Sequence, residues 1–176
     1  MTVIIDGTAG ITYPSGSGTQ AAQAKVLQVV NADLNTFFST TSTFPIDDTI
    51  PQNTEGAQIL TCAITPIFST SKLIIDVVMN VANDVASDIS IIALFQDTTA
   101  NALRASWSRT VAANNPVSAM VIKHYMTSGT TSATTFKVRG GGLTGNAATF
   151  QINGGSGTRY LGGSLISSIT ITEIAA

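Results

Sequence analysis

A period of two in side-chain character constrains this chain more than any other feature. Between Leu73 and Val81 every odd-numbered residue is apolar, whereas the even-numbered residues include Asp76 and Asn80. Successive side chains of a β-strand point to opposite faces, so the pattern predicts a strand with one buried face.

Further segments from Lys25 onward are rich in strand formers, poor in helix formers and separated by turn residues. The turn-like Asp97–Asn101 predicts that the segment after it returns as a hairpin partner of the segment before it. About eight or nine antiparallel strands at this spacing predict an all-β fold, a β-sandwich or jelly roll. The main predicted strands are Ile59–Ile64, Leu73–Val81, Asp88–Gln96, Ala102–Thr110, Val117–Thr127, Thr134–Arg139, Ala148–Asn153 and Ser164–Ile174.

The first 24 residues differ from the remainder. Thr2–Ile5 predicts one short strand, and Pro14–Gln20 has the polar composition of a flexible segment. A short helical turn is predicted near Ala21–Val26. We therefore predict an N-terminal arm over residues 1–24 and a β domain over 25–176. A frayed terminus is the alternative, but apolar side chains favour an arm that docks on another surface. These predicted anchoring residues are Val3, Ile4, Ile5 and Ile11.

Composition excludes several classes of protein. Charged residues make up 10% of the chain and apolar residues 44%, a combination that excludes a disordered chain and a coiled coil. A net charge of −2 argues against a nucleic-acid partner. The opening MTVIIDGT lacks the basic residues of a signal peptide, and no apolar run is long enough for membrane insertion. The single cysteine, Cys62, lies in an apolar run and is predicted to be a small buried residue.

Two predicted strands are apolar on both faces. Ile89, Ile91, Ala93 and Phe95 share one face of the first, opposite Ile92 and Leu94. In the second, Met120, Ile122, His124 and Met126 lie opposite Val117, Ala119, Val121 and Tyr125.

A small sandwich buries one face of each sheet, so a second apolar face needs a cover from a loop of the same chain or from another subunit. Exposed apolar area favours association, and we predict a homo-oligomer. The predicted interface residues are Ile92, Leu94, Met120, Ile122, His124 and Met126.

The residues that could carry chemistry all have plainer explanations. His124 is the sole histidine, and no nucleophile motif accompanies it, so we expect a packed or interfacial side chain. Asp47 and Asp48 lie between prolines and are expected to be solvated loop acids. The runs Gly140–Gly142 and Gly154–Gly157 match no phosphate-loop pattern and predict turns or close-packed backbone. We therefore expect no enzyme activity, no cofactor and no metal.

Charge is divided between the two halves of the chain. Residues 1–100 carry a net charge of −7 and residues 101–176 a net charge of +5. Pairing of these charges within or between subunits is the plainer interpretation, and a basic patch for an anionic glycan or acidic partner is the functional one. Trp107 could serve sugar stacking, although a lone tryptophan is more often part of a core. The predicted receptor or partner contacts are Arg104, Trp107, Arg109 and Tyr160.

The sequence resembles a known family in several segments. The opening MTVIIDGTAGITYPSGSG, followed by KVLQVV, is similar to the N-terminal stretch of small bacteriophage tail-fibre-like proteins. ITPIFSTSKL, the segment around TSATTFKV and the closing SITITEI resemble their C-terminal β domain, at Ile64–Leu73, Ser128–Val138 and Ser168–Ile174. The resemblance implies a non-enzymatic virion protein, often a homotrimeric knob on the particle exterior, without catalytic residues.

One departure from the family bears on function, because this chain has a short arm where most relatives have a fibre shaft. We expect a bacteriophage virion structural protein, either a tail-fibre-like or receptor-binding knob or a capsid decoration protein whose arm clamps coat subunits. A polysaccharide depolymerase is disfavoured, because no segment resembles a paired-carboxylate site. The expected partners are further copies of the chain in a homotrimer, tail or major capsid proteins, and a host surface glycan.

Overall fold

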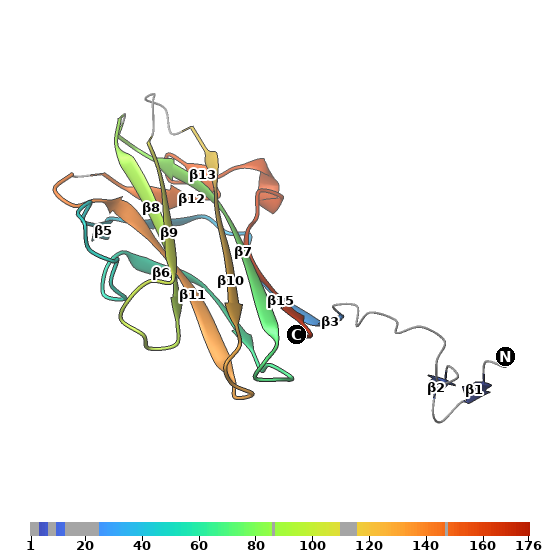
Figure 1. Cartoon of the computed structure of the whole chain (residues 1–176). Helices are drawn as coiled ribbons and strands as arrows, with labels where there is room; N and C mark the ends of the chain where they lie inside the picture. The colour runs from blue at the N-terminus through green and yellow to red at the C-terminus, as the bar shows by residue number, and fades with distance from the viewer. Residues whose placement is uncertain (1–3, 7–9, 13–24, 86, 110–115, 147) are drawn as a thin grey trace.

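The computed structural model describes residues 25–85, 87–109, 116–146 and 148–176, together with the backbone of 4–6 and 10–12 (Figure 1). The first sheet contains β3 (Val26–Leu34), β4 (Phe38–Thr40), β7 (Lys72–Asn83), β10 (Ser118–Thr127), β12 (Phe150–Ile152) and β15 (Ser167–Ile174). The second contains β5 (Thr43–Phe44), β6 (Ala57–Ile64), β8 (Ile89–Gln96), β9 (Arg104–Arg109) and β11 (Thr134–Leu143). The smaller elements are β1 (Ile4–Asp6), β2 (Gly10–Thr12), β13 (Gly154–Gly155), β14 (Thr158–Arg159) and the 3₁₀ turn η1 (Leu161–Gly163). No helix in these ranges has the length and apolar character needed to cross a membrane.

The long strands form a nested series of antiparallel pairs. β8 pairs with β9, β7 with β10, β6 with β11, and β3 with β15. These pairs make one long antiparallel ribbon, and successive pairs along it lie alternately in the second and the first sheet. The long strands have the order β3-β15-β7-β10 in the first sheet and β6-β11-β8-β9 in the second. This is the connectivity of an eight-stranded jelly roll. The predicted all-β sandwich or jelly roll is confirmed, whereas the predicted trimer concerns more than one chain and stays a prediction.

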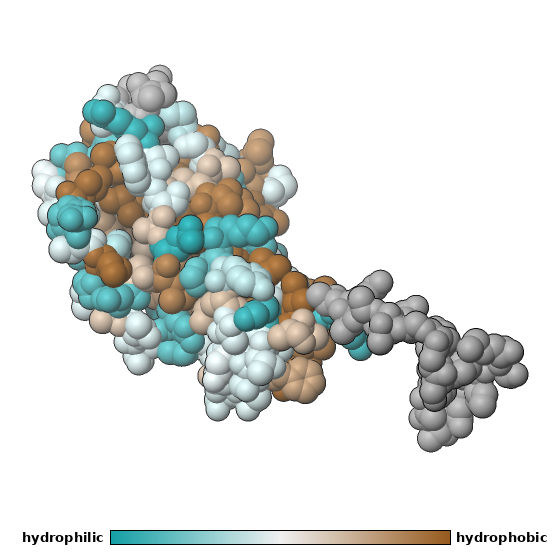
Figure 2. Space-filling model, in the orientation of Figure 1, coloured by the Kyte–Doolittle hydropathy of each residue, from teal (hydrophilic) through white to brown (hydrophobic). Residues whose placement is uncertain are grey.

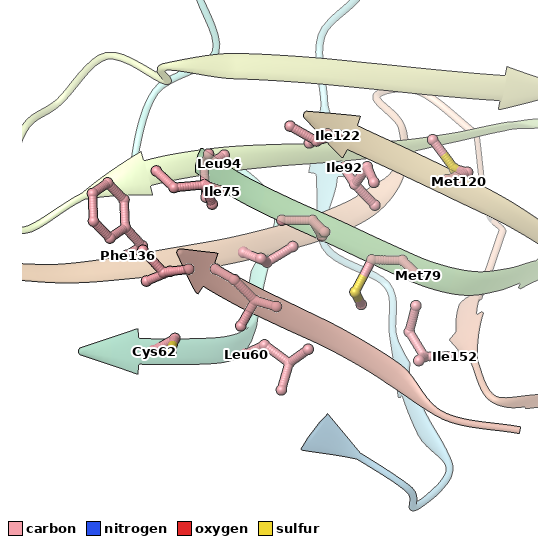
Figure 3. Close-up of a cluster of buried hydrophobic side chains, with 14 of the residues drawn as sticks. Leu60, Cys62, Ile75, Met79, Ile92, Leu94, Met120, Ile122, Phe136 and Ile152 are labelled. Atoms are coloured by element: carbon pink, nitrogen blue, oxygen red, sulfur yellow. The ribbon is translucent and has the colours of Figure 1, made fainter. Parts of the chain in front are cut away.

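The core lies between the two sheets and follows the alternation seen in the sequence. Leu73, Ile75, Val77, Met79 and Val81 of β7 are all buried, with exposed fractions of 0–1%. Facing side chains from β6, β8 and β11 fill the space beside them (Figure 3). Cys62 is part of this cluster as a free, buried thiol, as predicted.

Four of the six predicted interface residues are buried in this same core, so that prediction is wrong for them. Ile92 and Leu94 of β8 and Met120 and Ile122 of β10 are 0–3% exposed within a single chain (Figure 3). The face assigned to a second subunit is the face that the opposite sheet covers. Met126 is partly buried against the core and His124 is half-buried on the same side of β10.

The second apolar face of β8 is covered by the chain itself. Ile91, Ala93 and Phe95 form a separate buried cluster with Phe44, which lies in the short strand β5. A loop of the same chain is thus the cover, one of the two alternatives left open by the sequence.

Backbone packing explains the first glycine run. Gly140–Gly142 lies inside β11 rather than in a turn. A Cβ atom on Gly141 would lie 2.3 Å from the carbonyl oxygen of Ser42, and one on Gly140 would lie 2.6 Å from Cδ1 of Ile59. The absence of a side chain therefore lets the segment before β5 approach β11 closely.

The N-terminal predictions are only partly within the described residues. β1 overlaps the predicted first strand and pairs with β2 as a two-stranded sheet of their own. Val3 and residues 21–24 of the predicted helical turn lie outside the described residues, and Val26 begins β3. The division into an arm and a β domain stays a prediction.

Candidate functional site

A hollow of about 290 Å³ lies on the outer face of the second sheet. Its floor comes from β8 and β9, where the antiparallel register places Trp107 beside Ile91. Its wall is the loop between β5 and β6. The residues that line it are Pro45, Ile46, Asp47, Thr49, Pro51, Ile91, Ala105, Ser106 and Trp107.

The wall of the hollow is fixed at both ends. At one end, Phe44 is fully buried, and β5 runs parallel to the end of β11. The N–H of Thr144 donates to the Phe44 carbonyl at 2.9 Å. At the other end, the N–H of Ala102 donates to the Pro51 carbonyl at 2.9 Å, and Gln52 forms a β-bridge with Asn101. The loop over 45–51 is therefore a short span between two anchored points.

Within this loop, a side-chain turn holds Asp47 in place. The N–H and hydroxyl of Thr49 both donate to Oδ1 of Asp47, at 2.9 and 2.5 Å. These hydrogen bonds, first from the hydroxyl and then from the backbone, hold the pKa of the Asp47 carboxyl below its usual value. Asp47 and Asp48 are exposed loop residues, as predicted.

Trp107 lies exposed at the hollow rather than in the core. It is the only tryptophan of the chain, and 61% of it is exposed. Its position follows from strand alternation. Ser106 and Ser108, on either side of Trp107, pair with Ile92 and Ser90, which face the core. Trp107 between them therefore faces outward.

The other predicted contact residues are spread over the molecule. Arg109 lies two residues from Trp107 on the same face of β9, and its Nε donates to the Ser87 carbonyl at 3.0 Å. Arg104 lies on the opposite face of β9. Tyr160 is half-buried beyond β14, where its N–H donates to the Asn153 carbonyl. Of the predicted set, Trp107 alone lines the hollow.

The sequence did not predict the remaining residues of the hollow. Pro45, Ile46 and Pro51 come from a loop that was considered only for its two acids. The available signal was the aromatic Phe44 directly before a proline-flanked segment that contains the apolar Ile46 and Ile50. Binding sites are lined mainly by apolar and aromatic side chains, and such a segment supplies them.

The jelly-roll ribbon brings the acidic and basic halves of the chain together. Lys123 forms an ion pair with Asp76 at 3.3 Å, the one ion pair among the described residues. Arg139 donates to the carbonyls of Glu55 and Gly56 at 2.7 and 2.6 Å. Burial lowers the pKa of Arg139. Bases of the second half thus bind backbone carbonyls of the first half as well as its carboxylates.

His124 and Cys62 are placed for packing. Nδ1 of His124 is buried without a hydrogen-bond partner, and burial, followed by the charge of Arg104, lowers the pKa of the imidazole. Burial raises the pKa of the Cys62 thiol. No group of three or more His, Cys, Asp or Glu side chains within the described ranges is placed to hold a metal ion.

Glu173 is a buried carboxylate that the sequence analysis did not single out. Its Oε1 accepts the N–H of Ile67 at 2.8 Å and that of Phe68 at 3.3 Å, and its Oε2 accepts Nε2 of Gln28 at 2.6 Å. Burial alone raises the pKa of Glu173, but these hydrogen bonds outweigh burial and the net pKa lies below its usual value. Glu173 thereby ties β15 to the loop between β6 and β7.

The outer face of the first sheet carries the most exposed apolar side chains of β7 and β10. Val121 pairs beside Val78, and Tyr125 pairs beside Ile74. Val121 is 56% exposed and Tyr125 is 61% exposed, and the Lys123–Asp76 ion pair separates the two apolar pairs. Figure 2 shows apolar patches between polar areas on one face of the molecule.

Comparison with known proteins finds little similarity. No family model matches the chain, and no curated protein matches it. Among solved structures, the crystal structure of dimeric latent PorU from Porphyromonas gingivalis aligns with 87% of this chain at 7% identity and a TM-score of 0.41. The chain spans 13% of that protein. At this TM-score the likeness carries no argument about function.

Proposed function

We propose that the chain is a non-enzymatic structural protein on the exterior of a bacteriophage particle, where its jelly roll acts as a tail-fibre-like or receptor-binding knob. One observation supports this proposal most. The three segments that resemble the tail-fibre-like family are far apart in the sequence, yet hydrogen bonds join them at one end of the sandwich.

The contacts between these segments are specific. Glu173, from the third segment, binds the backbone of Ile67 and Phe68 in the first. Ser128, which opens the second segment, donates its hydroxyl to the Phe68 carbonyl at 2.7 Å and its N–H to the Ser71 carbonyl at 2.9 Å. Chance similarity between strand-forming sequences does not require the three similar segments to contact one another in the fold. This supports descent from the family and, through it, the proposed function.

Self-association is part of the proposal. Homotrimer contacts are assigned to the outer face of the first sheet, around Val121 and Tyr125, because these apolar side chains are left exposed. The four core residues named above play no part in this interface. Sedimentation equilibrium is the test, since a trimer that becomes a monomer in Val121→Asp supports the assignment and an unchanged trimer contradicts it.

A capsid decoration protein is the second candidate. It is favoured by the N-terminal pairing of β1 with β2, which form a two-stranded sheet apart from the two main sheets. Ile4, Ile5 and Ile11 lie in these strands and stay the predicted anchoring residues, together with Val3.

Electron microscopy of phage particles with gold-labelled antibodies against residues 25–176 tests the proposal. Label at the tail supports a knob, label over the whole capsid supports decoration, and unlabelled particles contradict both. Deletion of residues 1–20 should abolish attachment to the particle and leave the oligomer intact. Loss of the oligomer would contradict the role given to the arm.

A further inference from the structure

We propose that the hollow between the 45–51 loop and β9 binds a neutral, hexose-containing glycan, with Trp107 as the stacking surface and Asp47 as a hydrogen-bond acceptor. The inference deepens the proposed function, on which it rests, because it names the class of ligand that a receptor-binding knob would recognise. Binding sites combine apolar and aromatic lining with a few placed polar groups, and this hollow has that composition.

Trp107 supplies the surface that a sugar ring needs. The C–H face of a pyranose is apolar and flat enough to stack on an indole, while its hydroxyl groups point outward from the ring edge. An exposed tryptophan keeps a large apolar area in water, and covering that area is favourable. Ile91 and Ala105 lie beside Trp107 at the floor, so a ring stacked there also covers aliphatic surface.

Asp47 supplies the polar contact. An ionised carboxylate offers about four acceptor positions, and Thr49 occupies two of them. The remaining positions can accept sugar hydroxyls. Because the Thr49 contacts fix the carboxylate before any ligand arrives, little conformational entropy is lost when it binds.

Charge favours a neutral sugar over an anionic one. The one ion pair within the described part of the chain joins Lys123 to Asp76, so the Asp47 carboxylate faces the hollow without a cationic partner. Arg109, the nearest base along β9, lies outside the lining of the hollow, and its Nε donates to the Ser87 carbonyl. A carboxylated or sulphated sugar would meet the negative charges of Asp47 and Asp48.

The lining also favours a glycan over a proline-rich peptide. Grooves that bind such peptides are lined by several aromatic side chains that hold successive residues of an extended helix. Here Trp107 is the one aromatic residue of the lining. A single aromatic surface suits one ring of a sugar chain.

The test uses the full chain on an array of neutral oligosaccharides of glucose, galactose, mannose and N-acetylglucosamine. Sialylated and sulphated oligosaccharides and a proline-rich peptide are included. Sugars that bind are then titrated by isothermal calorimetry and by the emission of Trp107, the sole tryptophan. We expect binding to neutral sugars with a change in that emission.

Two pairs of variants separate the hollow from the rest of the surface. Trp107→Ala should weaken binding at least about tenfold, as for truncation of an aromatic anchor. Phe68→Ala, an exposed aromatic residue in the loop between β6 and β7 and outside the lining, should leave it within about twofold. Asp47→Asn should weaken binding and Asp48→Asn, outside the lining, should not. Unchanged melting temperatures show that the variants are folded.

Three outcomes overturn the inference: no binding to any neutral sugar, binding confined to anionic sugars or the peptide, or neutral-sugar binding that Trp107→Ala leaves intact. Each is distinct from failure of the proposed function, which is decided by antibody labelling of particles. Labelled particles together with a chain that binds no neutral sugar would leave a virion protein with a different ligand.

Discussion

β8 and β10 present the same sequence pattern but have different surroundings. Both strands are apolar on both faces, and in both the inner face is buried in the core between the sheets. The outer face of β8 is covered by Phe44 of β5, directly before the 45–51 loop, whereas Val121 and Tyr125 on the outer face of β10 remain exposed. The same period-two pattern thus has two outcomes, and a distant segment of the chain decides between them.

The difference also separates two kinds of surface. The loop that covers β8 forms the wall of a defined hollow, so that side of the molecule suits a small ligand. The outer face of β10 has no such loop and suits a flat partner such as another subunit. We therefore propose that ligand recognition and assembly use opposite sheets.

Removal of the cover from β8 should have the largest effect. Phe44→Ala leaves a cavity above Ile91, Ala93 and Phe95, and loss of a buried phenylalanine costs about 3–5 kcal/mol in the free energy of unfolding. Urea denaturation followed by circular dichroism measures this. Tyr125→Ala is the control, expected to change stability by less than about 0.5 kcal/mol when measured below the concentration of any assembly. Equal losses of stability for the two variants would mean that the outer faces of β8 and β10 do not differ in how they are covered.

Two neighbouring residues of β10 should differ in how much they contribute to the free energy of unfolding. Ile122→Ala is expected to cost about 2–5 kcal/mol because Ile122 lies in the core, and Val121→Ala should cost less than about 1 kcal/mol. Denaturation below the concentration of any assembly measures both values. A large cost for Val121→Ala with a small one for Ile122→Ala would mean that Val121, and not Ile122, faces the core, and would contradict the orientation of β10.

Glu173→Gln should have a moderate effect that depends on pH. The folded pKa of Glu173 lies below its ordinary 4.5, so its stabilisation is present above that value and is lost as pH falls through the folded pKa. Replacement should cost about 1 kcal/mol at pH 7, the size of a hydrogen-bond contribution, and less in acid. Melting temperatures between pH 7 and 3 measure the difference. A cost that grows toward low pH would contradict the account.

The smallest effect concerns His124 of β10, whose pKa is lowered by burial and by the charge of Arg104 in β9. Its folded pKa lies below its ordinary 6.5, so the unfolded chain takes up a proton first and stability falls as pH drops below 6.5. His124→Gln should reduce this decline between pH 7 and 5 and leave stability above pH 7 nearly unchanged. The melting temperature of each protein over this range is the measurement, and identical slopes would show that His124 does not contribute.

The alternation along β7 and the hairpin of β8 with β9 could be predicted because both depend on local periodicity and turn residues. The choice between the two faces of β10 could not, since it depends on which sheet lies opposite, a contact between distant residues. The hollow was missed for the same reason. Trp107 and Pro45 are far apart in sequence, and Phe44 joins their segments only after β5 pairs with β11. The burial of Glu173 could not be predicted, because its partners are the backbone N–H groups of Ile67 and Phe68 and the distant side chain of Gln28.

The rate of thiol modification at adjacent positions of β10 tests the orientation of the two faces most directly. Val121→Cys and Ile122→Cys are compared by reaction with a thiol reagent, and the unaltered chain, with its buried Cys62, serves as the blank. The account predicts fast modification of Val121→Cys in dilute solution, slower modification as copies assemble, and protection of Ile122→Cys throughout. Rapid modification of Ile122→Cys in the folded chain, with Val121→Cys protected at every concentration, would contradict it.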